Sequence, residues 1–505
     1  MDLLGGFATL AGDPVSLAFI FFGAVFGVVA GAIPGLTTAA AIAIVLPVTF
    51  YLPPLAGLTF LYVIGKAGRY GGSIAAVLFN TPGTSAAAAT QIEGHPLARQ
   101  GKAGKAIKMS TLASVCGDFL GDMLLIFCAA LIASFTVKLG PPEYFAIYVM
   151  AFIVIGSVVG NDVLRGLAST VFGVLIAMVG LDYISGSTRY DYGIVNLMSG
   201  FKLVPVLIGV FVISEVLVQA EKTAASAVQL FIAPKTVNKA DQKLTAEEIR
   251  RCLPVILRCT GIGAFIGILP GLGSAVACFI AYGEERRRAK RPELWGKGAI
   301  EGVAAPEAAN NAVSGPSMIP LLTLGIPGST VGAMMMGVFL VHGIQVGPTI
   351  FITSGELVYA LFAAGLLGIL SYGLIGWFFS GIVGRLIALA PPRLVYPSVL
   401  LLAFLATYSV RNSLFDVGVM VVFGLIGYFM RRFQFSAAAF LIAFVLAPGA
   451  EEALRQSLQM SGDDPMIFFQ RPLTLLFFAI ALVGLGSRVY GQVKRRRARA
   501  DAAAG

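Results

Sequence analysis

Long, unbroken apolar blocks set the hydrophobic pattern of this chain. Residues 15–33 and 472–486 are two examples, and neither alternates apolar with polar positions as the strands of a transmembrane barrel do. With 57% hydrophobic residues among 505, and about 20 residues per bilayer crossing, the chain has material for about 10–14 transmembrane or re-entrant helices. The pattern predicts an all-α polytopic membrane protein.

The interruptions of these blocks are more informative than the blocks themselves. Glycine is abundant, with 60 residues, and it gathers with proline inside apolar surroundings. Four Pro-Gly pairs have apolar flanks on both sides: Pro34-Gly35, Pro82-Gly83, Pro270-Gly271 and Pro327-Gly328. They predict helices that break within the membrane. The alternative is that glycine and proline only permit kinks or close helix crossings, as is common in membrane helices.

The breaks recur in two halves. Pro270 follows Pro34 by 236 positions and Pro327 follows Pro82 by 245, while the two histidines, His95 and His342, are 247 apart. This indicates a degenerate internal repeat. The helix after the first break ends in the uncharged residues 51–54, whereas the helix after the third break runs into the charged residues 284–288. Matching helices therefore exit on opposite faces of the membrane, which is typical of inverted-topology repeats in secondary transporters. We expect an elevator-type transporter, in which helical hairpins move against a scaffold.

The organisation that follows has six parts. Residues 14–134 form the first repeat with a re-entrant hairpin, and residues 252–350 form the second. Scaffold helices occupy 135–219, a cytoplasmic linker 220–251, C-terminal scaffold or interface helices 351–490, and a basic cytoplasmic tail 491–505. Lys66 and Arg69, which lie between the two breaks of the first half, are interpreted as the cytoplasmic mouth of a hairpin.

Charge is scarce and basic. Only 12% of the residues are charged, about half the share usual in soluble proteins, so a soluble enzyme is excluded. The formal net charge of +10 comes from short clusters between apolar blocks, which positive-inside bias explains better than nucleic-acid binding. The clusters expected in the cytoplasm are residues 99–108, 235–251, 286–291, 431–432 and 494–499.

No catalytic constellation is present in the sequence. The chain has no Gly-x-x-x-x-Gly-Lys-Ser/Thr phosphate loop, only two histidines, and five cysteines without Cys-x-x-Cys spacing. We therefore expect no enzyme activity, metal or cofactor, and transport driven by an ion gradient or by another subunit.

A helix that breaks in hydrocarbon frees backbone groups that must be buried or serve a ligand. Half-helix N-termini suit an anionic substrate, and freed carbonyls suit a cation such as Na⁺. The predicted substrate-binding residues are Thr37, Thr38, Asn80, Thr81, Gly83, Thr84, Ser85, Asn310, Asn311, Gly328, Ser329 and Thr330. The predicted ion-binding residues are Gly35, Gly271, Ser274, Thr323 and Gly325.

For five further polar residues, the sequence leaves open whether the role is functional or structural. Asp118 and Asp122 lie four apart on one helix face, where an ion pair or helix contact near the basic cluster ending at Lys108 is favoured over a functional carboxylate. Glu307 either caps a helix start near Lys297 or contacts ligand. His95 and His342 either relay protons or close helix ends.

Several longer motifs carry a family resemblance. They are Tyr70-Gly71-Gly72-Ser73 continuing to Asn80-Thr81-Pro82-Gly83-Thr84, residues 94–104 from Gly94-His95-Pro96, residues 298–312 with Pro306-Glu307-Ala308-Ala309-Asn310-Asn311, and residues 320–329 ending in Ile326-Pro327-Gly328-Ser329. With these motifs the chain resembles the large membrane subunit, the TctA family, of tripartite tricarboxylate transporters. Trp295, His95 and Val346 depart from the pattern, and they leave the substrate open among citrate-like tricarboxylates, dicarboxylates and aromatic acids.

The resemblance implies a location, partners and an activity. It implies the bacterial inner membrane, a small four-helix membrane subunit, a periplasmic solute-binding protein, and carboxylate import coupled to Na⁺ or H⁺, with a homodimer of the heterocomplex as a further expectation. The alternative function is a passive channel or structural membrane subunit without ion coupling.

Overall fold

The computed structural model describes residues 2–33, 36–136, 139–158, 162–182, 185–225, 242–347, 349–389 and 392–504. Helices dominate these residues. The strands within them are β1 (Gly180–Leu181) and β2 (Thr188–Arg189), which pair antiparallel. The prediction of an all-α protein is therefore confirmed.

The first half of the chain is a series of long helices joined by short turns. Asp13 begins the second of them, because its carboxylate accepts from the amides of Val15 and Ser16 while Pro14 needs no partner for its nitrogen. The helices are α1 (Leu3–Ala11), α2 (Pro14–Ala32), α3 (Thr38–Val45) with η1 (Leu46–Phe50), α4 (Pro54–Phe79), α5 (Ala87–Arg99) and α6 (Ala103–Thr136).

The middle of the chain includes the segment predicted as a linker. Its helices are α7 (Pro141–Val158), α8 (Val163–Ala177), α9 (Val195–Met198), α10 (Leu203–Leu207), η2 (Ile208–Ile213) and α11 (Ser214–Ala225). The next helix, α12 (Ala246–Ile268), begins inside the predicted linker 220–251, because Thr245 and Glu248 form a reciprocal capping box. Residues 226–241 of that linker lie outside the described residues.

The second half continues in the same way to the C-terminus. Its first helices after α12 are α13 (Gly273–Arg288), η4 (Pro292–Leu294), α14 (Glu301–Ala312), α15 (Met318–Leu324), α16 (Thr330–Val341), α17 (Ile350–Thr353) and α18 (Gly355–Leu374). The remaining helices are η5 (Ile375–Phe379), α19 (Ser380–Leu389), α20 (Pro392–Arg411), α21 (Leu414–Arg432), α22 (Ala437–Ser461), α23 (Ile467–Gln470) and α24 (Pro472–Ala504).

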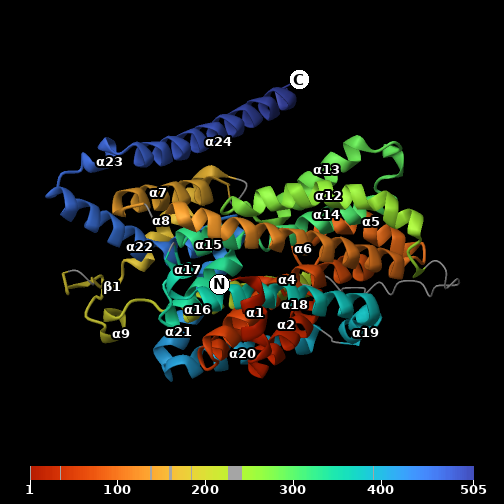
Figure 1. The fold of residues 1–505 in the computed structure, drawn as a ribbon, viewed down its shortest axis with the longest axis horizontal. Coiled ribbons are helices and arrows are strands. Elements are labelled where there is room, and N and C mark those ends of the chain that lie inside the picture. Colours follow the sequence, from red (N-terminus) through yellow and green to blue (C-terminus); the bar gives the residue numbers. More distant parts are fainter. Residues whose placement is uncertain are drawn as a thin grey trace.

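Many of these helices suit a bilayer. Among the described residues, 8 helical stretches are long and apolar enough to cross a membrane, and five shorter apolar helices accompany them. Large apolar side chains such as Phe127 and Leu131 on α6 are exposed. α24 lies along the outer edge of the molecule, beside α7 (Figure 1). The chain is therefore a multi-pass membrane protein, and the expected number of spans stays a prediction.

The two halves pack on each other in a reciprocal way. Within the halves, α2 lies along α4, and α12 lies along α14. Between the halves, α6 packs on α12 and α14, while α18 packs on α2 and α4 (Figure 1). Each half therefore contributes one long helix to the broken-helix pair of the other.

Candidate functional site

The first two breaks meet. Pro34 and Gly35 lie outside the described residues, but α2 ends at Ala32 and α3 begins at Thr38. At the second break, α4 ends because Asn80 adopts left-handed backbone geometry, with φ 55°. Gly83 donates its amide to the Gly72 carbonyl at 3.4 Å, and a Cβ on Gly83 would overlap the Gly31 carbonyl oxygen at the end of α2. The turn after α4 therefore rests directly on the end of α2.

The third and fourth breaks also meet. α12 ends at Ile268, and Gly271 and Gly273 have φ values of 86° and 69°, which favour glycine. At the fourth break, Gly325 ends α15 with φ 70°. The Gly271 amide donates to the Gly328 carbonyl at 3.1 Å. The two breaks in each half are therefore in contact.

Six of the twelve predicted hydroxyl and amide ligands have local partners. Thr37, Thr84 and Ser329 accept from backbone amides at helix starts. Asn80 accepts from Gln91, while Thr81 and Thr323 donate to the carbonyls of Phe79 and Ile319. Ser85 is exposed, and Ser274 and Thr330 are half-buried at the starts of α13 and α16. The six side chains with local partners therefore stabilise the ends of the broken helices.

Three of the predicted residues behave differently. Thr38, Asn310 and Asn311 are buried, yet the Thr38 hydroxyl, the Asn310 Oδ1 and both amide atoms of Asn311 have no hydrogen-bond partner among the described residues. Buried polar atoms of native proteins almost always have a partner. These atoms therefore mark a place where a ligand or water is expected.

A buried arginine contacts one of these residues, Asn310. Arg69 on α4 is 9% exposed, and its Nη1 donates a long bond of 3.5 Å to the Asn310 carbonyl on α14. Asn310 returns a bond from its amide to the Arg69 carbonyl at 3.4 Å. Thr38 lies against Gly68, the residue before Arg69. Among the described residues, no carboxylate lies within ion-pair distance of Arg69.

One turn away on α4, Lys66 forms the centre of a buried ion-pair network. Its Nζ lies 2.6 Å from Asp118 Oδ1 and 2.8 Å from Asp122 Oδ1 on α6. Tyr62 donates to Asp122 at 3.0 Å, and Tyr372 on α18 donates to Asp118 at 3.1 Å. The interpretation of Lys66 and Arg69 as a cytoplasmic hairpin mouth is wrong, because both side chains are buried. The ion-pair role favoured for the two aspartates is found, but their partner is Lys66 and not the cluster ending at Lys108.

Glu307 does not cap a helix start. It lies within α14, fully buried, and accepts from the hydroxyls of Thr90 and Ser114. The expected pairing near Lys297 is therefore wrong. The two histidines contact backbone: His95 Nδ1 lies 3.2 Å from the Val77 carbonyl, and His342 Nε2 lies 3.1 Å from that of Thr49.

These features define a class of protein: a multi-pass membrane protein with paired broken helices around a buried, charged centre. Known sequences then identify the family. Residues 17–442 match the model of the tripartite tricarboxylate transporter TctA family, and the chain belongs to that family. Its members are components of tripartite transporters, which also have a small membrane subunit and a periplasmic binding subunit.

Two relatives from Agrobacterium vitis support the assignment. The chain is 34% identical over 501 residues to the "Uncharacterized 52.8 kDa protein in TAR-I ttuC' 3'region", covering 98% of each chain. It is 37% identical over 224 residues to the "Uncharacterized protein in TAR-II ttuC' 3'region", covering 44% of this chain and 90% of that one. No solved structure matches the chain.

Proposed function

We propose that the chain is the large transmembrane subunit of a binding-protein-dependent secondary active importer of tricarboxylates or related carboxylates. It works in the bacterial inner membrane, with a Na⁺ or H⁺ gradient as the driving force. The observation that carries the proposal is the buried Arg69 guanidinium in contact with Asn310. Asn310, Thr38 and Asn311 each carry buried polar atoms without a partner among the described residues.

Arg69 is suited to a carboxylate substrate. A guanidinium has five N–H donors in a planar fork that matches a carboxylate. The bond to the Asn310 carbonyl is long, at 3.5 Å, so most of that capacity is available to a ligand. We propose that the unpartnered Asn311 amide and Thr38 hydroxyl reach the same ligand as neutral groups, without another buried charge. A carboxylate held here would satisfy groups that are costly to leave unpaired.

The contacts of the breaks support two repeats and a moving core. In each half the two breaks touch, and each half inserts one long helix, α6 or α18, against the broken-helix pair of the other. This reciprocity is expected of inverted repeats related by a two-fold axis, with binding at their interface. The paired breaks would then move as an elevator against the remaining helices.

The coupling ion is assigned to the freed carbonyls near Gly35, Gly271, Ser274, Thr323 and Gly325. Gly271 and Gly325 have left-handed backbone at helix ends, where carbonyl groups lose their helical partners. A small four-helix membrane subunit and a periplasmic solute-binding protein complete the transporter, and we propose a homodimer of this heterocomplex. We propose no cofactor besides the coupling ion.

Uptake by the reconstituted complex tests the proposal. Labelled citrate and a panel of dicarboxylic and aromatic acids are offered to proteoliposomes that contain both membrane subunits and the binding protein, with and without inward Na⁺ or H⁺ gradients. We expect accumulation above equilibrium that collapses with one gradient. Equilibration that follows only the solute gradient would indicate a passive channel and overturn the proposal.

The same assay tests the role of Arg69. Arg69→Gln should lower uptake about ten- to a hundred-fold, because a charge-assisted hydrogen bond is lost, and Arg69→Lys should recover only part of it. The matched control is Arg471→Gln, which removes an arginine paired with Glu143 on α7. Equal uptake in the Arg69 and Arg471 variants, at equal protein levels, would remove Arg69 from the substrate site.

A further inference from the structure

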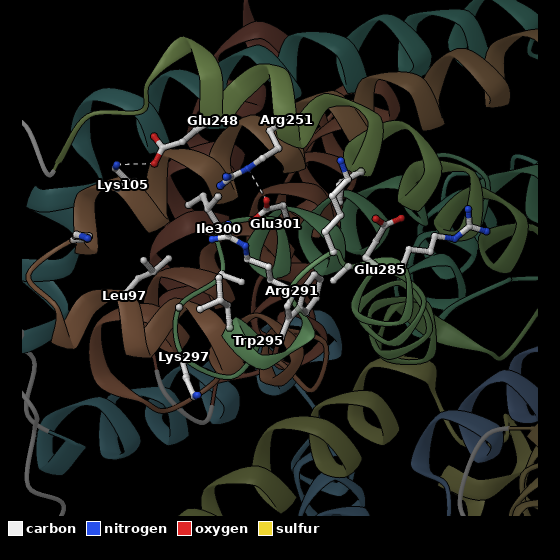
Figure 2. A pocket seen from close by; sticks show the side chains of 18 of the residues that line it. Leu97, Lys105, Glu248, Arg251, Glu285, Arg291, Trp295, Lys297, Ile300 and Glu301 are labelled. Atoms are coloured by element: carbon white, nitrogen blue, oxygen red, sulfur yellow. Dashed lines mark hydrogen bonds and ion pairs between the residues drawn. The ribbon is translucent and has the colours of Figure 1, made fainter.

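A second polar feature lies away from the helix breaks themselves, near the ends of α5 and α13 and the starts of α6 and α12 (Figure 2). It is a pocket of about 730 Å³, lined on one side by the segment around Trp295 and Lys297. Arg251 and Arg291 enter it from different elements, above Trp295. Because α13 rises about 1.5 Å per residue over 16 residues from the third break, the pocket lies roughly 20 Å from that break.

The pocket collects basic residues from separate parts of the chain. Its lining includes members of three clusters that positive-inside bias assigns to the cytoplasm, residues 99–108, 235–251 and 286–291. Eight lining residues are basic and three are acidic. A scattered surface charge pattern would not bring three clusters, spread between residues 99 and 291, around one cavity.

The three acidic residues are already neutralised. Glu248 pairs with Lys105 at 2.7 Å, Glu301 with Arg251 at 2.6 Å, and Glu285 with Arg258 at 2.7 Å. These pairs hold the walls of the pocket together.

A fourth basic residue, Arg288, pairs with Glu284 outside the lining at 2.6 Å, so four cations remain. Lys102, Lys290, Arg291 and Lys297 line the pocket, and no carboxylate of the described residues lies within ion-pair distance of them. The pocket is therefore a concave site with a surplus of positive charge.

The segment around Trp295 and Lys297 is held in place by a buried carboxylate. Glu93, fully buried on α5, accepts from the amides of Gly298 and Ala299 at 2.8 Å each, and also from that of Gly296. Tyr282 donates to the same carboxylate at 2.8 Å. This segment of the pocket lining is thus preorganised, which lowers the entropy cost of binding a ligand.

We infer that this pocket binds a phosphate-bearing anion on the cytoplasmic side. The four unpaired cations match the charge and the multiple oxygen acceptors of a phosphate group. Apolar wall residues, Leu97, Val255 and Ile300, lie beside the cations, and α12 also exposes Leu253 and Leu257. An apolar wall next to a cationic pocket fits the headgroup of an anionic phospholipid, and free phosphate offers the same chemistry. The inference does not depend on the proposed transport function.

Trp295 provides the test, because it lies in the pocket and is 9% exposed. Trp377 is the second tryptophan of the two in the chain, so Trp377→Phe leaves Trp295 as the only indole. The full chain carrying this change is placed in phosphatidylcholine nanodiscs with a minority of brominated phosphatidylglycerol or, separately, brominated phosphatidylcholine. We expect stronger quenching of Trp295 by the brominated anionic lipid. In a further arm, inorganic phosphate is added to nanodiscs of unbrominated phosphatidylcholine alone.

Charge reversal in the pocket decides the outcome. Lys290→Glu with Arg291→Glu should abolish the preference for the anionic lipid, since each basic side chain near headgroups contributes about five-fold to association. The control is Arg250→Glu with Arg286→Glu, two exposed residues outside the pocket lining, and it should keep the preference. A phosphate-dependent change in emission, lost only in the pocket variant, would assign the site to the free anion. Equal quenching by both lipids with no response to phosphate, or equal loss in both variants, would overturn the inference.

Discussion

Removing the Lys66 ammonium should strongly destabilise the protein. Lys66→Met keeps most of the side-chain volume but leaves Asp118 and Asp122 buried without their cation, with side chains 0% and 1% exposed. At an effective dielectric constant of about 20, each N–O contact corresponds to roughly 6 kcal/mol of attraction. Desolvation cancels much of that attraction in the intact network, but losing one partner of a buried pair typically costs about 3–5 kcal/mol. We expect a loss of that size.

The assay is thermal unfolding of the full chain in detergent, followed by size-exclusion chromatography after heating. The triple variant Lys66→Met, Asp118→Asn, Asp122→Asn should recover most of the loss, because neutral amides can still accept from Tyr62 and Tyr372. If the two aspartate changes restore stability, the loss in Lys66→Met came from the broken ion pairs and not from other effects of replacing Lys66.

A partly exposed pair supplies the control for this prediction. Lys105 and Glu248 have side chains 13% and 20% exposed, so Lys105→Met should cost only about 1 kcal/mol or less. The reasoning is refuted if Lys66→Met unfolds at the same temperature as Lys105→Met, or if the triple variant is no more stable than Lys66→Met.

Three further changes have defined outcomes. Asn311→Leu removes two buried, unpartnered amide atoms, so it should raise the free energy of unfolding by about 1–3 kcal/mol while uptake falls; lower stability in the thermal assay would contradict this. Gly83→Ala forces a Cβ against backbone and should cost about 1–3 kcal/mol, whereas Gly261→Ala, with open space around it, should not destabilise in the same assay. Glu93→Ala frees the 295–299 segment from its anchor, so trypsin should cut faster at Lys297 in inside-out vesicles, and an unchanged cleavage rate would contradict the anchoring role.

The membrane helices and the positions of their ends could be predicted from short stretches of sequence. Apolar block length predicts membrane helices, and the positions of proline and glycine anticipate where helices end. Near Pro82 and Pro327 the ends are made by Asn80 and Gly325 in left-handed geometry, a conformation that Asn and Gly adopt readily. Local pattern did not show a second reason for glycine at position 83, where a Cβ would overlap the Gly31 carbonyl oxygen at the end of α2.

The charged centre could not be read from local pattern, because its partners are distant in sequence. Lys66 meets its two aspartates 52 and 56 residues later, and Arg69 meets Asn310 after 241 residues. A signal was present: two cations in one apolar helix and two carboxylates in another require each other within a membrane. Glu93 had no comparable signal, since its three backbone donors come from a segment about 200 residues away.

The charge of the buried centre gives a physical reason for ion coupling. Lys66 and Arg69 balance Asp118 and Asp122, so these four groups sum to zero before substrate arrives, and the buried Glu307 nearby can only add negative charge. A carboxylate bound at Arg69 would leave at least one negative charge uncompensated where charge is costly to bury. A cation that binds with the substrate, at the freed carbonyls of the breaks or as a proton on a buried carboxylate, removes that cost. Tight substrate binding at this centre and entry of a cation are therefore expected to be linked.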